Sequence, residues 1–465
     1  MLRLCSIICL LLVWTGYQPA LSQRDSVAVD LVKAIRTAIE VSPEIGAGTA
    51  KYDYASARLG LARSSRYLTE FNLTTAHAPV PGLTNPNNTP SGQLFLDPDV
   101  RSEYDKLRIF NRVDVELLQP LYTWGELSGS IAAARSGVRL EQAGVDAITR
   151  EVALRTGELY FNFLLASELS RIVVEAGSIV EQAKTEISTM IDEGNPDVDD
   201  ADLFQVLITE QEYKRRVIEV DEKLQTAQAA LSRQLMLDDR AVVYSEDSLL
   251  EPLLTERDSL NFFQELALRN RPEIRQVEAG INARTALLGV ARSDLYPKLF
   301  IGARFNVRST AGRFRQDGPF HGDPFTGQSI EAGIGLRQKL NFGQTSAKIR
   351  QAQSELNEVD FQRIAAQQLI LFEVENAYRN LIIAESALES QNEALRISRE
   401  WLQLESINFD LDLGDTENLV KAVRANLELQ AEAQQSIHAY NIAVLRLYDA
   451  CGILVSRIRN GTLVE

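Results

Sequence analysis

The sequence predicts an internally duplicated α+β membrane protein that combines long helical hairpins with four transmembrane β-strands per chain. Three observations point to this fold class. Short motifs recur at constant spacing, several stretches alternate between apolar and polar residues, and proline-free stretches carry a heptad pattern. We expect each half to contain two short helices, a strand, a loop, a second strand and then two very long helices.

The N-terminal residues have the composition of a secretory signal. A single charge, Arg3, precedes an apolar stretch from Ile7 to Trp14, and the small residues of a cleavage site follow at 20–22. We therefore expect residues 1–22 to be a signal peptide that is cleaved before Gln23.

Composition limits the classes of protein and partner. Cys5 and Cys9 lie in the expected signal, so the mature chain would keep Cys451 alone and form no internal disulfide. A formal net charge of -16 disfavours a nucleic-acid partner, because phosphate binding needs a basic surface. After the signal there is no uncharged apolar stretch near the roughly 20 residues of a helical span, so strands must make any membrane contact.

Two blocks of residues show the duplication. Pro43-Glu44-Ile45 recurs 229 residues later as Pro272-Glu273-Ile274, and both motifs suit a helix start. At the same spacing, these seven residues recur: Ala57, Leu59, Gly60, Ala62, Arg63, Ser64 and Tyr67. In a second block, 218 residues separate these residues from identical ones: Gly125, Ile131, Ala134, Tyr160, Asn162 and Ala166. We expect a first repeat at 23–237, a linker at 238–257, a second repeat at 258–454 and a C-terminal tail at 455–465.

The strands are predicted from alternation with a period of two. In the second half the apolar members of the first strand are Leu299, Ile301, Ala303, Phe305 and Val307, and those of the second are Ile330, Ala332, Ile334, Leu336 and Leu340. The first half shows the pattern over 109–117 and more weakly over 71–78. Segments rich in glycine and proline, 79–98 and 309–328, are predicted to be loops. An ordinary antiparallel sheet beside a helical bundle is the alternative.

The long helices are predicted from a heptad pattern. One apolar stripe consists of Ile370, Val374, Ala377, Leu381, Ala384 and Leu388, spaced alternately by four and three residues. A second stripe, Leu371, Tyr378 and Ile382, would widen the buried face. No proline occurs from Trp124 to Met190, and such a helix would be roughly 100 Å long.

Four strands are too few to close a bacterial outer-membrane barrel, which needs at least about 8. An open edge in lipid would leave backbone groups unpaired at a cost of several kcal/mol each. Several chains must therefore share one barrel.

The ordered motifs resemble the TolC-like outer membrane efflux protein family, also called outer membrane factors. They are the paired Pro-Glu-Ile segments, 119–125 with its echo at 338–343, and Ala450-Cys451-Gly452-Ile453-Leu454. The resemblance covers nearly the whole mature chain. It implies a homotrimer that shares a twelve-stranded barrel in outer-membrane lipid and continues into the periplasm as a helical tunnel. It also implies a passive exit channel for tripartite efflux or type I secretion. The implied partners are a periplasmic adaptor (membrane fusion) protein and an inner-membrane transporter.

The same resemblance places the two long hairpin turns, 194–202 and 410–417, at the narrow periplasmic mouth of the tunnel. The candidate mouth residues are Asp197, Asp199, Asp200, Asp202, Asp410, Asp412, Asp415, Glu417 and Asn418. In a trimer these acids would form rings that attract cations, unless they only complement helix dipoles. Family members often carry two aspartates just after the second turn, but this chain has Asn418-Leu419-Val420-Lys421, which argues against a tight cation ring there.

The sequence offers no enzyme motif. His77, His321 and His438 lack metal-ligand spacing, and neither a phosphate-binding glycine loop nor a serine elbow is present. We therefore expect no catalytic residues, no cofactor and no metal. The alternative from another class is a periplasmic adaptor or coiled-coil scaffold without a pore. Such an adaptor should show one helical hairpin between split β-domains rather than two copies of hairpins interrupted by strands.

Overall fold

The computed structural model describes residues 26–67, 70–194, 200–238, 242–245, 250–255, 258–411 and 416–463. The expected signal peptide at 1–22 lies outside these ranges. The chain divides into two compact units. One contains 1–46, 147–271 and 369–465, and the other contains 47–146 and 272–368.

Each half opens with a pair of short helices, as predicted. These are α2 (Leu31–Val41) and α3 (Pro43–Ser64) in the first half, and α6 (Leu260–Asn270) and α7 (Pro272–Ser293) in the second. Asp30 caps α2 by accepting a hydrogen bond from the backbone of Lys33, and Ser259 caps α6 in the same way. Proline opens both α3 and α7, and a glutamate lies in each first turn, so the two Pro-Glu-Ile motifs do start helices.

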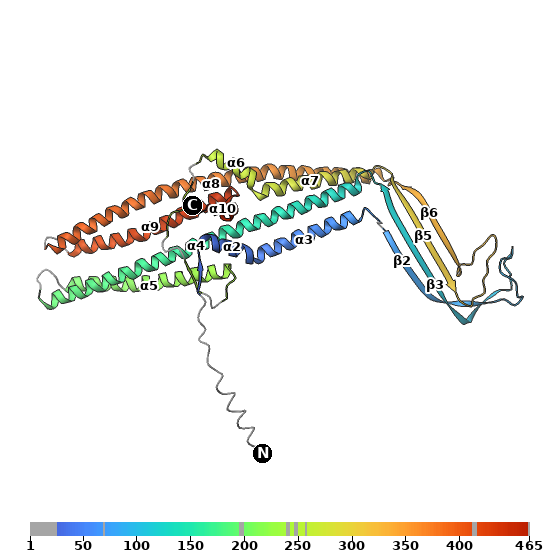
Figure 1. Ribbon diagram of the computed structural model, residues 1–465, viewed down its shortest axis with the longest axis horizontal. Coiled ribbons are helices and arrows are strands. Elements are labelled where there is room, and N and C mark those ends of the chain that lie inside the picture. Colours follow the sequence, from blue (N-terminus) through green and yellow to red (C-terminus); the bar gives the residue numbers. More distant parts are fainter. Residues whose placement is uncertain are drawn as a thin grey trace, which may run out of the picture. The chain divides into compact units, whose positions relative to one another are not determined.

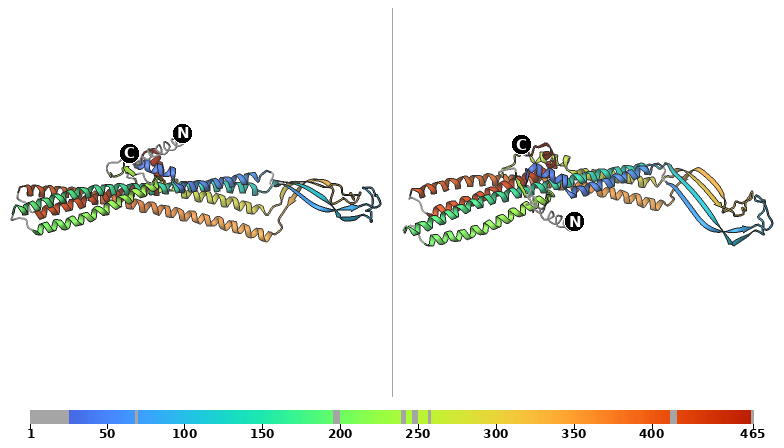
Figure 2. Two further views of the ribbon diagram at one scale, coloured as in Figure 1. Left: turned by 90° about the horizontal axis from the view of Figure 1, so that it is seen from below. Right: turned by 60° about the horizontal axis from the view of Figure 1, so that its bottom comes forward.

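Each half closes with a long helix followed by a shorter one. The first pair is α4 (Glu126–Asp192, 67 residues) and α5 (Asp200–Gln234, 35 residues). The second pair is α8 (Phe342–Asp410, 69 residues) and α9 (Thr416–Ala450, 35 residues). In Figures 1 and 2, α4 runs beside α5 and α8 runs beside α9. The proline-free stretch is therefore one continuous helix, as predicted.

The first heptad stripe lies in the core. Val374 is fully buried, Ile370, Ala377, Leu381 and Leu388 are nearly so, and Ala384 is half-buried. The second stripe was predicted to widen the buried face, and within the single chain it does so only in part: Leu371 and Tyr378 are half-buried, whereas Ile382 is 47% exposed. Tyr378 contacts Phe263 of α6 within the chain, with the ring centroids 5.9 Å apart.

A two-stranded pairing joins the two halves near their starts. The strand β1 (Ser26–Val29) pairs in parallel with β4 (Val242–Ser245), which lies in the expected linker. The expected C-terminal tail contains a further helix, α10 (Leu454–Asn460), whose Leu454 and Ile458 are buried. The sequence analysis predicted neither feature.

Four antiparallel strands form the larger sheet, in the order β2-β3-β5-β6. They are β2 (Glu70–Thr84), β3 (Arg101–Tyr122), β5 (Lys298–Thr310) and β6 (Gly327–Arg337), and they lie side by side in every view of Figures 1 and 2. The two halves meet in this sheet through β3 and β5.

The predicted loop boundaries need correction. Residues 79–84 belong to β2 rather than to a loop, although they include Pro79 and Pro81. Within the single chain proline is tolerated there because β2 is an edge strand, where a missing N–H need not break the ladder. The second loop is shorter than predicted at both ends, and β6 stops at Arg337, before Leu340.

Candidate functional site: a two-faced sheet and two helix turns

One face of the four-stranded sheet is apolar. In the strand register Leu73 pairs with Val115, and Val115 pairs with Phe305. Phe305 in turn pairs with Ile330, which is 78% exposed, so an apolar row crosses all four strands. Neighbouring rows add Phe71, Leu117, Ala303, Ala332, Ile301 and Ile334. An exposed apolar band of this kind is what a strand presents to lipid.

The opposite face is polar, and several of its charges are paired. Arg304 on β5 bonds Glu116 on β3 with 2.7 Å between Nη2 and Oε1. Arg112 lies 2.6 Å from Asp114, whose Oδ1 also accepts a 2.6 Å hydrogen bond from the buried Asn306 amide. Alternation therefore places charges on one face and apolar side chains on the other, as predicted. Charged and hydrogen-bonded side chains of this kind suit a face that lies against water.

An aromatic cluster marks the end of the sheet at which α4 begins. The Trp124 ring stacks on Tyr296 with centroids 4.8 Å apart, and Tyr122 meets Trp124 edge-on at 5.0 Å. The indole N–H of Trp124 donates to the carbonyl of Pro297 at 2.8 Å. A register shift between Pro120 and Tyr122 brings Tyr122 opposite Leu299 on the apolar face. Aromatic rings at strand ends are typical of a membrane interface.

Sequence reasoning did not identify this cluster as a site. Tyr122 and Trp124 close a strand of the first half, whereas Tyr296 opens a strand of the second, and only the β3–β5 pairing brings them together. The usable signal was the presence of aromatic residues at the same end of two predicted strands.

The helix turns hold the predicted mouth residues, of which the structure describes only some. Asp197, Asp199, Asp412 and Asp415 lie outside the described residues. Asp200 begins α5 and is exposed, Asp202 lies in the same helix, and Asp410 ends α8. Glu417 and Asn418 lie exposed in the first turn of α9. The acidic mouth therefore stays a prediction.

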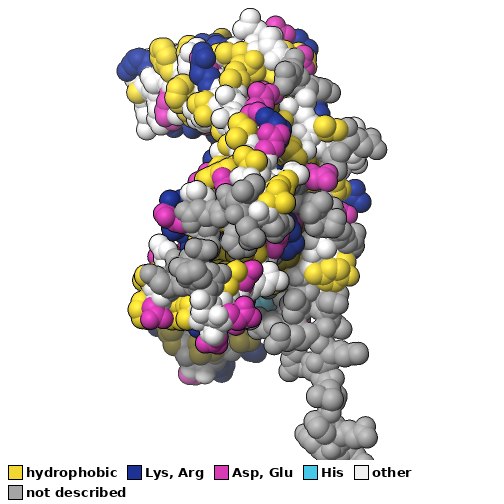
Figure 3. All heavy atoms as spheres, turned by 90° about the vertical axis from the view of Figure 1, so that its left-hand side faces the viewer, with side chains coloured by type: hydrophobic (Ala, Val, Ile, Leu, Met, Phe, Trp, Pro, Cys, Tyr) yellow, Lys and Arg dark blue, Asp and Glu magenta, His cyan; other side chains and the backbone are white. Residues whose placement is uncertain are grey.

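Glu417 has a close cation. Its Oε1 lies 2.6 Å from Nζ of Lys421, one turn further along α9, and both side chains are exposed. This ion pair offsets part of the negative charge at the second turn. Figure 3 looks onto the molecule from the side on which both turns lie, and acidic, basic and hydrophobic side chains are intermixed there.

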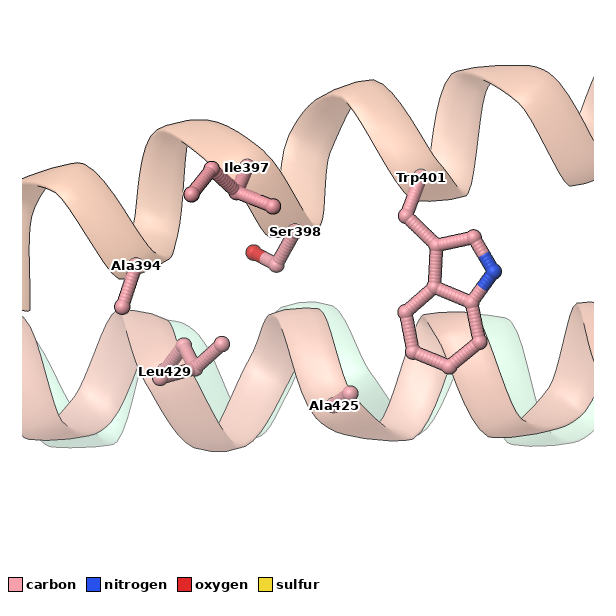
Figure 4. A pocket seen from close by; sticks show the side chains of 6 residues that line it. All are labelled: Ala394, Ile397, Ser398, Trp401, Ala425 and Leu429. Atoms are coloured by element: carbon pink, nitrogen blue, oxygen red, sulfur yellow. The ribbon is translucent and has the colours of Figure 1, made fainter.

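A shallow apolar groove runs between α8 and α9 (Figure 4). It has a volume of about 380 Å³ and is lined by Ala394, Ile397, Ser398, Trp401, Ala425 and Leu429. Beside it, the buried Asn426 amide donates a 2.9 Å hydrogen bond to Ser398 and so ties the two helices together. None of these lining side chains is charged.

Two of the histidines each have an asparagine as a close partner. Nδ1 of His77 lies 2.7 Å from the Asn111 amide oxygen on the sheet, and Nε2 of His438 lies 2.8 Å from that of Asn162 in the helices. Over the ranges that the structure describes, no three His, Cys, Asp or Glu side chains gather as a metal site would require. In the same ranges no helix has a stretch both long and apolar enough to cross a membrane.

Comparison with protein families finds a match in the second half of the chain. Residues 264–452 match the family described as Outer membrane efflux protein. A comparison with the curated proteins found no match. The predicted location, the outer membrane with the helical part in the periplasm, agrees with this family.

Solved structures share the fold. The outer membrane protein VceC of Vibrio cholerae matches with a TM-score of 0.69 at 16% identity, over 91% of this chain and 96% of its own. The CmeC outer membrane channel of Campylobacter jejuni gives 0.71 at 15% identity, over 95% and 93%. The MtrE outer membrane channel of Neisseria gonorrhoeae gives 0.70 at 16% identity, over 91% and 88%. The resemblance predicted from the sequence is therefore confirmed: residues 264–452 match the outer membrane efflux protein family, and the fold is shared with solved outer-membrane channels.

Proposed function

We propose that three copies of this chain form a passive exit channel through the outer membrane and the periplasm. The observation that carries the proposal is the four-stranded sheet with an apolar face, a charged face and open edges at β2 and β6. Unpaired backbone groups at these edges would cost several kcal/mol each in lipid. Pairing β6 of one copy with β2 of the next satisfies both edges, and three copies give twelve strands.

The helices support the same assembly. Large apolar side chains stand exposed on α5 and α8 in the single chain, among them Phe204, Ile208, Phe372 and Ile383. Soluble surfaces rarely carry many such residues, and helices of neighbouring copies would cover them. The helices then form the wall of a duct in the periplasm.

The duct would serve a tripartite efflux or type I secretion system. A periplasmic adaptor protein and an inner-membrane transporter would deliver the cargo, and the acidic turns between α4 and α5 and between α8 and α9 would form the periplasmic mouth. No chemical step is required of the channel itself, so we assign it no catalytic role. The solved channels VceC, CmeC and MtrE support this proposal through their shared fold.

Two measurements on the mature protein purified in detergent test the proposal. Its mass should be that of a trimer at micromolar concentration, and it should form conducting pores in a planar lipid bilayer. A monomer or a dimer without conductance would overturn the proposal. Release from membranes by a salt wash would instead favour the adaptor or scaffold without a pore.

A further inference from the structure

The two loops that join the strands of the sheet are bound to each other. These loops, 85–100 and 311–326, cross where the Gly92 amide donates to the Asp317 carbonyl at 2.8 Å. The crossing is tight, because a Cβ on Gly318 would stand only 2.3 Å from the carbonyl oxygen of Gln93. Only glycine fits there, and the two loops form one folded cap.

The cap is fastened to the polar face of the sheet. Thr310 on β5 donates a 3.0 Å hydrogen bond to the carbonyl of Phe325, and Arg308 donates to that of Pro324 at 3.3 Å. The Phe325 ring meets Phe110 of β3 edge-on at 5.6 Å. The register places Arg308, Thr310 and Phe110 on the face that carries Asp114 and Arg304.

A nearly buried ion pair holds the second loop in this position. The Arg313 guanidinium, 9% exposed, lies 3.3 Å from Asp323, whose side chain is 1% exposed. Arg313 also donates to the Pro81 carbonyl of β2 at 3.2 Å and covers the Phe325 ring at 4.3 Å. Asp323 accepts from the backbone amides of Gln316 and Phe325 at 3.1 and 2.8 Å. The pair thus ties the loop to β2 and to itself.

The tip of the cap is apolar and uncovered in the single chain. Phe95 is 82% exposed and Phe320 is 84% exposed, and Leu94 and Leu96 beside Phe95 are more than half exposed. The loops cross at Gln93 and Gly318, and Phe95 and Phe320 lie two residues after these positions. Four large apolar side chains therefore gather on a short loop tip.

We propose that the loop tips of three copies cover one another and narrow the outer mouth of the channel, with the ion pair of Arg313 and Asp323 as the fastening. This inference rests on the trimeric channel proposed above. Each tip is covered by a second copy of this chain and not by lipid. The reason is that the cap is fastened to the polar face, whereas lipid would lie against the apolar face. Because the cap is attached to the polar face, which would line the inside of the proposed ring, we expect Phe95 and Phe320 at its tip to face the other copies.

Cross-linking tests this proposal on detergent-solubilised trimers of the full mature chain. A Phe95→Cys variant, treated with a short bis-maleimide, should give covalently linked dimers on a denaturing gel. The native Cys451 is buried and gives no background. The matched control is Ser309→Cys, an exposed position on the apolar face opposite Asn111. Both variants should react with a monofunctional maleimide, but the control should give several-fold less cross-linked dimer.

Adding Arg313→Gln to Phe95→Cys should reduce the cross-linked fraction several-fold while leaving the trimer intact, because the fastening is lost. Intact trimers in which Phe95→Cys links no better than Ser309→Cys would overturn the inference and leave the proposed channel standing. An unchanged cross-link in the Arg313→Gln background would overturn the role of the ion pair. Failure of the native chain to form trimers would remove both proposals.

Discussion

Arg155 on α4 and Glu373 on α8 occupy equivalent positions in the two halves, 218 residues apart. Each forms an ion pair with a residue at or directly before the start of a short helix, but the basic partner lies on the long helix in the first half and the acidic partner lies there in the second. Arg155 donates to both carboxylate oxygens of Glu44 at 2.9 and 2.5 Å, at the start of α3. Glu373 accepts from Arg271 at 2.7 Å, directly before the start of α7. Each long helix is thus pinned to its own pair of short helices at the same point.

The two ion pairs should differ in strength. Arg271→Ala should lower the free energy of unfolding by roughly 1 to 3 kcal/mol, because Arg271 is buried and its removal takes a charged hydrogen bond from Glu373. Arg155→Ala should cost less than about 1 kcal/mol, because Arg155 and Glu44 are both substantially exposed. Urea unfolding followed by helical circular dichroism measures both. The double exchange Glu44→Arg with Arg155→Glu is the control and should recover most of the loss, and equal losses at Arg155 and Arg271 would contradict this prediction.

His438 should make stability depend on pH below neutrality. Burial lowers the pKa of His438, and the negative charge of nearby Glu158 offsets this lowering only in part. The unfolded chain then binds the proton more readily, with a pKa near 6.5. The contribution of His438 is present above that value and is lost as the pH falls through it. His438→Gln keeps a donor toward Asn162, so its stability should fall less between pH 7 and pH 5 than that of the native chain. Parallel pH profiles would show that His438 does not contribute.

The thiol of Cys451 should be unreactive in the folded chain. Burial raises the pKa of Cys451 to about 12, so almost no thiolate exists near neutral pH. Its side chain is also fully buried, and the thiol lies 3.6 Å from the carbonyl of Phe263. Iodoacetamide at pH 8 should label the folded protein many times more slowly than the urea-unfolded protein. Equal labelling rates would mean that this region opens readily.

The periodic elements were predictable from sequence because one residue pattern determines each of them. The heptad stripe ending at Leu388 gave α8, and alternation around Phe305 gave β5, since burial on one side imposes these periods. The limits of β2 were missed because Pro79 reads as a loop residue, and only the position of a strand at a sheet edge makes it acceptable. Alternation in β3 and β5 also could not show which polar residues of these strands would be buried.

Features that depend on distant pairing were not predictable. The strand β4 has only four residues, and its partner β1 lies at the other end of the first half. The stack of Trp124 on Tyr296 and the fastening of Arg313 to Pro81 also arise only when the strands meet. Asn306 alternates with the apolar residues of β5, and only its bond to Asp114 on the neighbouring strand makes it a buried residue of the polar face.

The two faces of β6 should tolerate a charge differently. Ala332 lies in the middle of the strand on the apolar face, and Gly333 is its neighbour on the polar face. An arginine at mid-bilayer on the lipid face costs about 2 to 4 kcal/mol. Ala332→Arg should therefore reduce the yield of assembled trimer strongly. Gly333→Arg is the matched control, because a Cβ there meets nothing within 4 Å, and it should assemble normally. Equal yields would remove the assignment of membrane and water faces.

Replacing the acids of the second helix turn should change ion selectivity without changing assembly. The variant carries Asn or Gln at Asp410, Asp412, Asp415 and Glu417. Threefold symmetry would turn each acid into a ring, so the native channel should prefer cations in planar-bilayer conductance and the variant should do so less. Lys421 already offsets part of the charge of Glu417, so most of the change should come from the three aspartates. Trimer yield should stay the same because solvated charges add little to stability. The difference should shrink in 1 M salt, where the screening length is about 3 Å.

The control variant neutralises four exposed acids of α8 away from the turn, Glu358, Asp360, Glu389 and Glu400. Selectivity at low salt that is unchanged, or that changes equally in the control, would mean that the turn acids serve only to solvate the helix ends.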